Sequence, residues 1–192
     1  MEYENYIQEY IEKEKSLLDI LDQKTIGRLF GEIIDTYEHQ GTIYIFGNGG
    51  SAATASHFAN DFNKGVSEYT KNKFRFCCLN DNIPTVLAIA NDIGYANIFE
   101  FQLDGKVNDK DLVIGISGSG NSENIIRAIK FAKKEGAKTA GMCGFSGGKL
   151  AEEANTVVYV PCNNMQLVED IHMILCHMMM TVCYQMWNIK AH

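Results

Sequence analysis

The stretch Ile114-Gly115-Ile116-Ser117-Gly118-Ser119-Gly120-Asn121-Ser122-Glu123 decides the fold, because an apolar strand ends there in a Ser/Gly loop that opens a helix. A helix start leaves backbone N–H groups without partners and carries partial positive charge, so an oxyanion bound there is stabilised twice. The serines add hydroxyl donors. The loop contains no Lys or Arg, which disfavours a nucleotide-binding P-loop, because that loop needs its Lys. We therefore interpret the loop as a cradle for a small phosphate ester; an ordinary turn capped by Asn121 or Ser122 is the alternative.

Four other short apolar runs are typical of strands like the one that ends in this loop. Together with 112–116, the predicted strands are 42–46, 74–79, 137–142 and 156–160, and they alternate with helical patterns at about 51–63, 83–104, 121–135 and 164–187. This alternation predicts an α/β fold with a mostly parallel five-stranded sheet that is flanked by helices on both faces. Ligands of such folds bind at the carboxyl ends of the strands, near a switch in strand order.

Two amphipathic helices are predicted ahead of the first strand, at 2–22 and 24–39. We expect one domain over residues 1–192, with an N-terminal helical hairpin at 1–40 and an α/β core at 41–192. The hairpin has two possible partners: a neighbouring subunit, which would make it an oligomerisation element, or its own sheet.

A second Gly-rich turn, Gly47-Asn48-Gly49-Gly50-Ser51-Ala52-Ala53, follows the strand 42–46 and opens a helix of small residues. It lacks the G-x-G-x-x-G order of a dinucleotide-binding turn. A third polar turn, Asn91-Asp92 followed by Gly94, has the pattern of a helix C-cap.

Composition and charge narrow the class of partner. The chain has 192 residues, 46% of them hydrophobic, and a formal net charge of −7 without a basic block, which argues against nucleic-acid binding. The acidic start Met-Glu-Tyr-Glu-Asn does not match a signal peptide, and the six cysteines form no CxxC pair, so we expect a cytoplasmic protein with reduced thiols. Polar residues interrupt the apolar stretch Ile171–Trp187, so no membrane span and no membrane partner are expected.

Two histidines lie beside carboxylates at helical spacing. His57 and Asp61 are four residues apart, and Glu169 and His177 are eight apart, so each pair shares one helix face. Two nitrogen and two oxygen ligands suit a tetrahedral zinc site if the two helices come together. For a single pair, a solvated helix face or an Asp–His hydrogen bond is the more frequent explanation. The cysteines are interpreted as buried apolar residues.

The ordered motifs resemble one known family. They are Gly-Asn-Gly-Gly-Ser-Ala-Ala with His57, then Ala90-Asn91-Asp92-x-Gly94, then Gly-Ile-Ser-x-Ser-Gly-Asn-Ser, then Gly147-Gly148, then Glu169-Asp170-Ile171-His172 and His177. In this order they resemble the sugar isomerase (SIS) family, and most of all its phosphoheptose isomerases, over about residues 24–187. The resemblance implies a homotetramer of α/β subunits with active sites built between chains.

The resemblance also implies a reaction and a set of site residues. The reaction is the aldose–ketose isomerisation of sedoheptulose 7-phosphate to D-glycero-D-manno-heptose 7-phosphate through a cis-enediol. Zn²⁺, one per subunit, is implied at His57, Asp61, Glu169 and His177, and the catalytic groups are implied to be Asp61, Glu169 and His177. The implied substrate-binding residues are Asn48, Gly49, Gly50, Ser51, Asn91, Asp92, Ser117, Gly118, Ser119, Ser122 and Glu169.

Two residues depart from the family pattern. Phosphoheptose isomerases usually carry Glu at the position of Asp61 and Gln at the position of Glu169. The shorter Asp withdraws its carboxylate by one methylene, roughly 1.5 Å, and proton abstraction tolerates such displacement poorly. Either Glu169 has become the base, or the site binds without turnover. The alternatives to the isomerase are therefore a non-catalytic tetrameric SIS module that binds sugar phosphates or proteins, and an isomerase of another sugar phosphate; the presence of both carboxylates favours an enzyme.

Overall fold

The computed structural model describes residues 2–190 and contains one five-stranded sheet, in which every strand pair is parallel. The strand order is β2-β1-β3-β4-β5, with β1 at Ile43–Gly47, β2 at Phe76–Cys78, β3 at Leu112–Ser117, β4 at Lys138–Cys143 and β5 at Thr156–Tyr159. The predicted strands are confirmed to within two residues at each end. The chain runs outward from β1 to β2 on one side and from β3 to β5 on the other, so β1 and β3 flank the switch point at which such sheets bind ligands.

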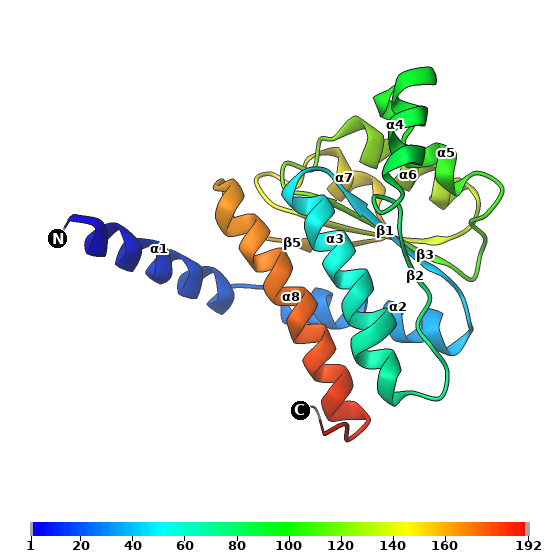
Figure 1. Ribbon diagram of the computed structural model, residues 1–192. Coiled ribbons are helices and arrows are strands. Elements are labelled where there is room, and N and C mark those ends of the chain that lie inside the picture. The colour runs from blue at the N-terminus through cyan, green and yellow to red at the C-terminus, as the bar shows by residue number, and fades with distance from the viewer. Residues whose placement is uncertain (1, 191–192) are drawn as a thin grey trace.

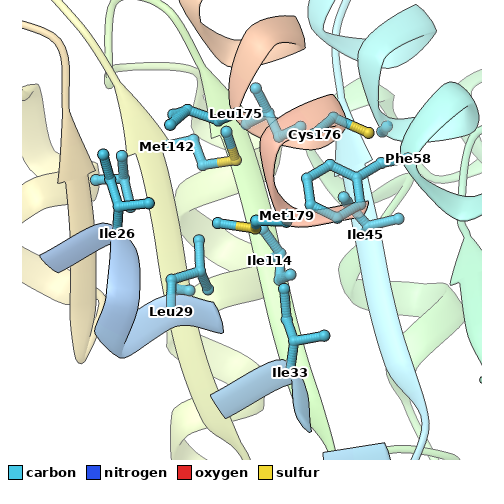
Figure 2. Close-up of a cluster of buried hydrophobic side chains, with 14 of the residues drawn as sticks. Ile26, Leu29, Ile33, Ile45, Phe58, Ile114, Met142, Leu175, Cys176 and Met179 are labelled. Atoms are coloured by element: carbon cyan, nitrogen blue, oxygen red, sulfur yellow. The ribbon is translucent and has the colours of Figure 1, made fainter. Parts of the chain in front are cut away.

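Helices cover both faces of the sheet (Figure 1). One face carries α2 (Gln23–Glu38), α3 (Gly50–Asn60) and α8 (Met165–Met186), whose buried apolar side chains meet those of the strands in one core. Figure 2 shows part of this core, where Leu29 and Ile33 of α2 and Met179 of α8 approach Ile114 of β3. The other face carries α4 (Ile83–Asp92), α5 (Glu100–Leu103), α6 (Glu123–Lys134) and α7 (Gly148–Glu153).

The strands are apolar on both faces because each face is buried. In β1, Ile43 and Ile45 belong to the first core, whereas Tyr44 and Phe46 belong to the second. Successive side chains of a strand point to opposite faces, so a strand covered on both sides appears in the sequence as a continuous apolar run. This is why the strands could be located from the sequence.

The helix predicted over 83–104 is wrong as a single element. The structure divides it into α4, the short 3-10 turn η3 (Tyr95–Asn97) and α5. The break lies at Gly94, whose φ of +100° favours glycine, and the N–H groups of Ile93 and Gly94 both donate to the carbonyl of Ile89. The short helix α7 was not predicted.

The two N-terminal helices do not form a closed hairpin. Helix α1 (Glu2–Asp19) extends away from the body, while α2 lies beneath the sheet (Figure 1). The apolar face of α2 is buried on the sheet through Ile26, Leu29 and Ile33 and is therefore not available to α1. Of the two alternatives for the hairpin, packing on its own sheet holds for α2, whereas α1 leaves several large apolar side chains exposed: Tyr3, Tyr6, Ile7, Tyr10 and Ile11.

Helix α8 is, among the described residues, the one helix long and apolar enough to cross a membrane by length and composition. The core helix of a folded domain meets the same criterion. Helix α8 lies beside α3 on one face of the sheet and buries four apolar side chains in the core there: Leu167, Ile171, Leu175 and Met179. This packing accounts for the apolar composition of the helix.

Candidate active site

A cavity of about 290 Å³ lies at the carboxyl ends of β1 and β3, at the switch point of the sheet. The turn after β1, the Ser/Gly loop after β3 and the first turns of α8 form its walls. Its lining residues are Asn48, Gly49, Gly50, Ser51, Ile116, Ser117, Gly118, Ser119, Ser122, Met165 and Glu169. The structure thus gathers nine of the eleven predicted substrate-binding residues into one pocket.

The Ser/Gly loop presents its hydroxyls at the start of α6. The Oγ atoms of Ser117 and Ser122 lie 3.2 Å apart, and Ser119 Oγ accepts the N–H of Asn121 at 3.3 Å. Ser122 occupies the N-cap position without a side-chain capping bond within the described chain; its hydroxyl shares a hydrogen bond with that of Ser117 and keeps further capacity to bond a ligand. With the helix start, these groups form a neutral site suited to a phosphate group.

The Ser/Gly loop is held by close backbone contact with the loop before α7. Gly120 has a φ of +68°, and a Cβ at this position would lie 1.9 Å from the carbonyl oxygen of Gly147. The N–H of Leu150 donates to the carbonyl of Gly120 at 2.9 Å. Only glycine fits this approach, so the cradle is fixed by backbone packing rather than by side chains.

The opposite wall is fixed by an amide pair. Asn48 and Asn124 each donate to the side-chain carbonyl of the other, at 3.0 and 2.9 Å, and the hydroxyl of Tyr95 also donates to Asn48 Oδ1 at 2.9 Å. Tyr95 lies directly after the Asn91-Asp92-x-Gly94 turn, so this turn reaches the pocket indirectly. Asn91 and Asp92 themselves are exposed at the end of α4 and do not line the cavity.

Glu169 is the carboxylate of the pocket. Its carboxyl group lies over Gly50, and a Cβ on Gly50 would meet the carboxyl atoms at 2.3 to 2.6 Å. The missing side chain of Gly50 therefore makes room for Glu169. Because Gly50 begins α3, the carboxylate faces a helix start, where negative charge is stabilised.

A second group of polar side chains lies further along the same two helices. His57 Nε2 is 2.9 Å from His177 Nε2 and 3.3 Å from Asp61 Oδ2, and His177 Nε2 is 3.9 Å from the same oxygen. Asp61 starts the π-helix η1 (Asp61–Val66), which continues α3, and local π-helix often occurs at functional sites. Three of the four predicted metal-binding residues are thus together.

The fourth predicted ligand, Glu169, is not part of this group. Glu169 precedes His177 by eight residues on α8, which corresponds to about 12 Å along the helix axis. Another side chain lies close to this group. The thiol of Cys176 forms, with His57 and Asp61, a set of potential metal-binding atoms that lie within 4.8 Å of one another.

Cys176 is the site residue that the sequence interpretation missed. Its thiol donates to Asp61 Oδ2 at 3.6 Å, although the two residues are 115 positions apart. Burial raises the pKa of the Cys176 thiol above its usual range, and the Asp61 carboxylate adds to this effect, so the proton stays on sulfur. The sequence contains one indication that Cys176 lies near these residues: it directly precedes His177. Cys77 is exposed and Cys162 half-buried, so the interpretation of all six cysteines as buried was wrong for these two.

Comparison with known proteins identifies the family. A model of the SIS domain matches residues 3–144. The phosphoheptose isomerase of Aliarcobacter butzleri (strain RM4018) is 31% identical over 188 residues, which cover 97% of each chain. That of Helicobacter pylori (strain P12) is 36% identical over 147 residues, covering 77% of this chain and 76% of the relative. A solved phosphoheptose isomerase from Neisseria gonorrhoeae superposes with a TM-score of 0.86 at 26% identity, over 96% of this chain and 97% of that one.

The parallel sheet, the pocket at its switch point and these matches define one class of protein: the chain belongs to the SIS domain family. The three relatives described above are all phosphoheptose isomerases. The resemblance drawn from the ordered motifs is therefore confirmed.

Proposed function

We propose that the protein is an aldose–ketose isomerase that interconverts sedoheptulose 7-phosphate and D-glycero-D-manno-heptose 7-phosphate. One observation carries this proposal: a single pocket combines two groups. One is the neutral oxyanion cradle at the start of α6, and the other is the carboxylate of Glu169 of α8, which lies over the start of α3. The phosphate group occupies the Ser/Gly loop, and the carbonyl end of the open-chain sugar lies at Glu169. The names of the relatives support the choice of substrate.

Glu169 is the proposed base. It removes the proton from C1 of the ketose while the C2 carbonyl oxygen takes a proton from water, which gives the cis-enediol. The carboxylic acid of Glu169 then delivers a proton to C2 while the C1 hydroxyl gives its own proton to water, which leaves the aldehyde. The backbone N–H groups at the start of α3 would stabilise the oxyanion that develops in each half of the reaction.

The choice of Glu169 over Asp61 follows from their surroundings. Glu169 lines the pocket, whereas Asp61 is largely buried, accepts the Cys176 thiol and does not line the pocket. Carboxylate, imidazole and thiol groups in close proximity suit a metal ion better than a sugar. His57, Asp61 and His177 would hold a Zn²⁺ ion, which would supply a fixed divalent charge between α3 and α8. His177, predicted as a catalytic group, is assigned to this metal site.

The assembly and compartment form a further part of the proposal. We infer a cytoplasmic homotetramer with active sites between subunits. The exposed apolar side chains of α1, and those of Ile83, Leu87 and Tyr95 around α4, support it, because a single chain leaves them in water. Sedimentation equilibrium measures the mass directly, and a monomer at micromolar concentration contradicts the assembly.

Replacing Glu169 with the isosteric Gln tests the proposed base. Glu169→Gln keeps the shape of the pocket but removes the proton acceptor, so kcat for sedoheptulose 7-phosphate is expected to fall by roughly 10²- to 10⁴-fold with little change in KM. Glu152→Gln, at an exposed position of α7, is the matched control and is expected to leave both constants unchanged. Retention of full kcat by Glu169→Gln would transfer the base role to another group.

A further inference from the structure

Two side chains from other parts of the fold hold the amide of Asn48. Asn48 follows β1 and lines the pocket, whereas Asn124 of α6 and Tyr95 of η3 contact Asn48 and do not line the pocket. Asn124 is buried, with 2% of its surface exposed, and the ring of Tyr95 is exposed. The two partners are 76 and 47 positions from Asn48 in the sequence, so only the fold brings them together.

A backbone group sets the direction of these hydrogen bonds. The N–H of Ile125 donates to Asn124 Oδ1 at 3.0 Å, and a backbone N–H can act only as a donor. This contact identifies the oxygen of the Asn124 amide, and with it the nitrogen. Asn48 Nδ2 donates to the same oxygen at 3.0 Å, and Asn124 Nδ2 donates back to Asn48 Oδ1 at 2.9 Å. The Asn48 amide therefore has one orientation, because a reversed amide would place like atoms together.

The tyrosine completes the bonds to the Asn48 oxygen. The Tyr95 hydroxyl donates to Asn48 Oδ1 at 2.9 Å. An amide oxygen has two lone pairs, and Asn124 and Tyr95 occupy both of them. The Asn48 nitrogen carries two hydrogens, of which Asn124 takes one, and the other has no acceptor among residues 2–190. Asn48 thus keeps a single free hydrogen-bonding group, an N–H donor.

This donor belongs to a residue between the two parts of the pocket that carry the proposed reaction. The amide pair is anchored on α6 two residues after Ser122 of the cradle. On its other side, Asn48 precedes by two residues Gly50, over which the Glu169 carboxyl group lies. A sugar phosphate that extends from the cradle to this carboxylate passes Asn48, and its oxygen atoms are acceptors. Linked hydrogen bonds polarise one another, so donation from Tyr95 also strengthens the N–H of the same amide.

We propose that Tyr95 is a positioning residue: it occupies the second lone pair of the Asn48 oxygen and so makes Asn48 a pure donor to an oxygen of the sugar chain. Inorganic phosphate has no sugar chain, so the cradle alone holds it and its binding does not depend on Tyr95. The Tyr95 hydroxyl therefore contributes to selectivity for a phosphorylated sugar over inorganic phosphate. The inference rests on the proposed function only in that a sugar phosphate occupies this pocket.

The binding of two probes tests the inference without turnover. Calorimetry measures the Kd of sedoheptulose 7-phosphate and of inorganic phosphate in proteins that carry Glu169→Gln, so that the sugar is bound and not isomerised. Tyr95→Phe keeps the ring, and with it the apolar surface around α4, but removes the hydroxyl. It is expected to raise the Kd of the sugar phosphate roughly 2- to 10-fold, the range for one neutral hydrogen bond, and to leave the Kd of inorganic phosphate unchanged.

Tyr37→Phe is the matched control, because the Tyr37 hydroxyl donates to the carbonyl of Asn72 at 3.3 Å and neither residue lines the pocket. It is expected to change neither Kd. A double-mutant cycle then separates positioning from a general structural effect. In Asn48→Ala proteins the Tyr95 hydroxyl has lost its partner, so Tyr95→Phe is expected to have no further effect on either Kd there. Melting curves show that each variant folds.

Three results would overturn the role of Tyr95. They are an unchanged Kd of the sugar phosphate in Tyr95→Phe, an equal loss of affinity for both probes, and the same loss whether or not the Asn48 side chain is present. A wild type that shows the expected selectivity but does not isomerise the sugar contradicts only the proposed function. Failure of the folded protein to bind sedoheptulose 7-phosphate would overturn both.

Discussion

Gly50 and Glu169 show how a missing side chain sets the chemistry. An alanine at position 50 would place its Cβ where the Glu169 carboxyl group now lies, and the flexible Glu169 side chain would move aside. Displacing a base by about 1 Å costs up to roughly 10²-fold in rate. In the proposed enzyme, the glycine at position 50 would therefore serve the placement of the Glu169 carboxylate rather than the stability of helix α3.

Gly50→Ala is expected to lower kcat by roughly 10- to 100-fold without loss of stability, since Ala is the better helix former. Gly27→Ala is the matched control, because Gly27 lies on α2 with nothing near its missing Cβ. Steady-state kinetics and melting temperatures of both variants check this. An unchanged kcat in Gly50→Ala would show that the position of the Glu169 carboxylate does not limit the reaction.

His172 makes stability depend on pH. It is fully buried on α8, and neither ring nitrogen has a hydrogen-bond partner among residues 2–190. Burial lowers its pKa to about 4, despite the nearby backbone of Cys143. The unfolded chain takes up this proton at about pH 6.5 and the folded chain only near pH 4, so stability is lost as the pH falls through this window.

Between pH 7 and pH 5 this group alone is expected to cost about 2 kcal/mol of unfolding free energy. His172→Leu removes the titrating group and abandons no hydrogen bond, so its stability is expected to fall less over the same range. Urea unfolding of both metal-free proteins at the two pH values measures the difference. Equal losses in the wild type and the variant would mean that His172 does not titrate in the window.

Helix α1 is joined to the body through an acidic contact with α8. The Tyr10 hydroxyl donates to Asp170, and this hydrogen bond raises the pKa of Tyr10 to about 12. Both carboxylate oxygens of Glu14 are buried without a partner in the described chain, and burial, followed by the charge of Asp170, raises the Glu14 pKa. The folded state therefore binds this proton more tightly than the unfolded state, and stability falls as the pH rises from about 4.5 towards neutrality.

Glu14→Gln is expected to raise the melting temperature at pH 7, with the gain shrinking towards pH 4.5, where Glu14 of the wild type is itself protonated. Glu12→Gln, on the same helix, removes an exposed ion pair with Lys15 and is expected to change little. Melting curves across the pH range compare the two. A gain that is independent of pH would rule out the charge of Glu14 as its cause.

The elements differ in how far the sequence reveals them. Strands buried on both faces are continuous apolar runs, so they were predictable from local pattern alone. The break at Gly94 was indicated by the C-cap pattern of Asn91-Asp92 and Gly94, but apolar residues that continue at helical spacing through Ile93 and Tyr95 into Ile98 favoured one long helix. Helix α1 was predicted as a helix, but its direction was not. The apolar face of α2 packs on the sheet and is therefore not available to α1, which local pattern does not reveal.

The molecule as a whole decides which residues of the site meet. Ser117 to Ser122 are contiguous, so the cradle was predictable from its loop. The pairing of Cys176 with Asp61 depends on two helices packing side by side, and no local pattern encodes it. Helical spacing alone could not show that Glu169 and His177 lie against two different places on α3: the packing of α3 on α8 brings Glu169 to Gly50 and His177 to His57.

The two sites at the ends of α3 and α8 divide the work of the proposed enzyme. In the proposed enzyme, the pocket at the switch point would bind the phosphate and move the proton, whereas His57, Asp61 and His177 lie together further along the same two helices. Glu169 can therefore serve as the proposed base in a chain that carries the shorter Asp61 further along α3.

The most direct test of the isomerase is proton exchange at C2. The zinc-loaded protein is incubated with sedoheptulose 7-phosphate in D₂O, and NMR follows the anomeric protons and the deuterium content of the aldose. The account predicts a mannoheptose 7-phosphate that carries deuterium at C2, because the base exchanges its proton with solvent before returning it to the enediol. Absence of both aldose and exchange, from folded and zinc-loaded protein, would contradict the account and leave a sugar-phosphate-binding domain without turnover.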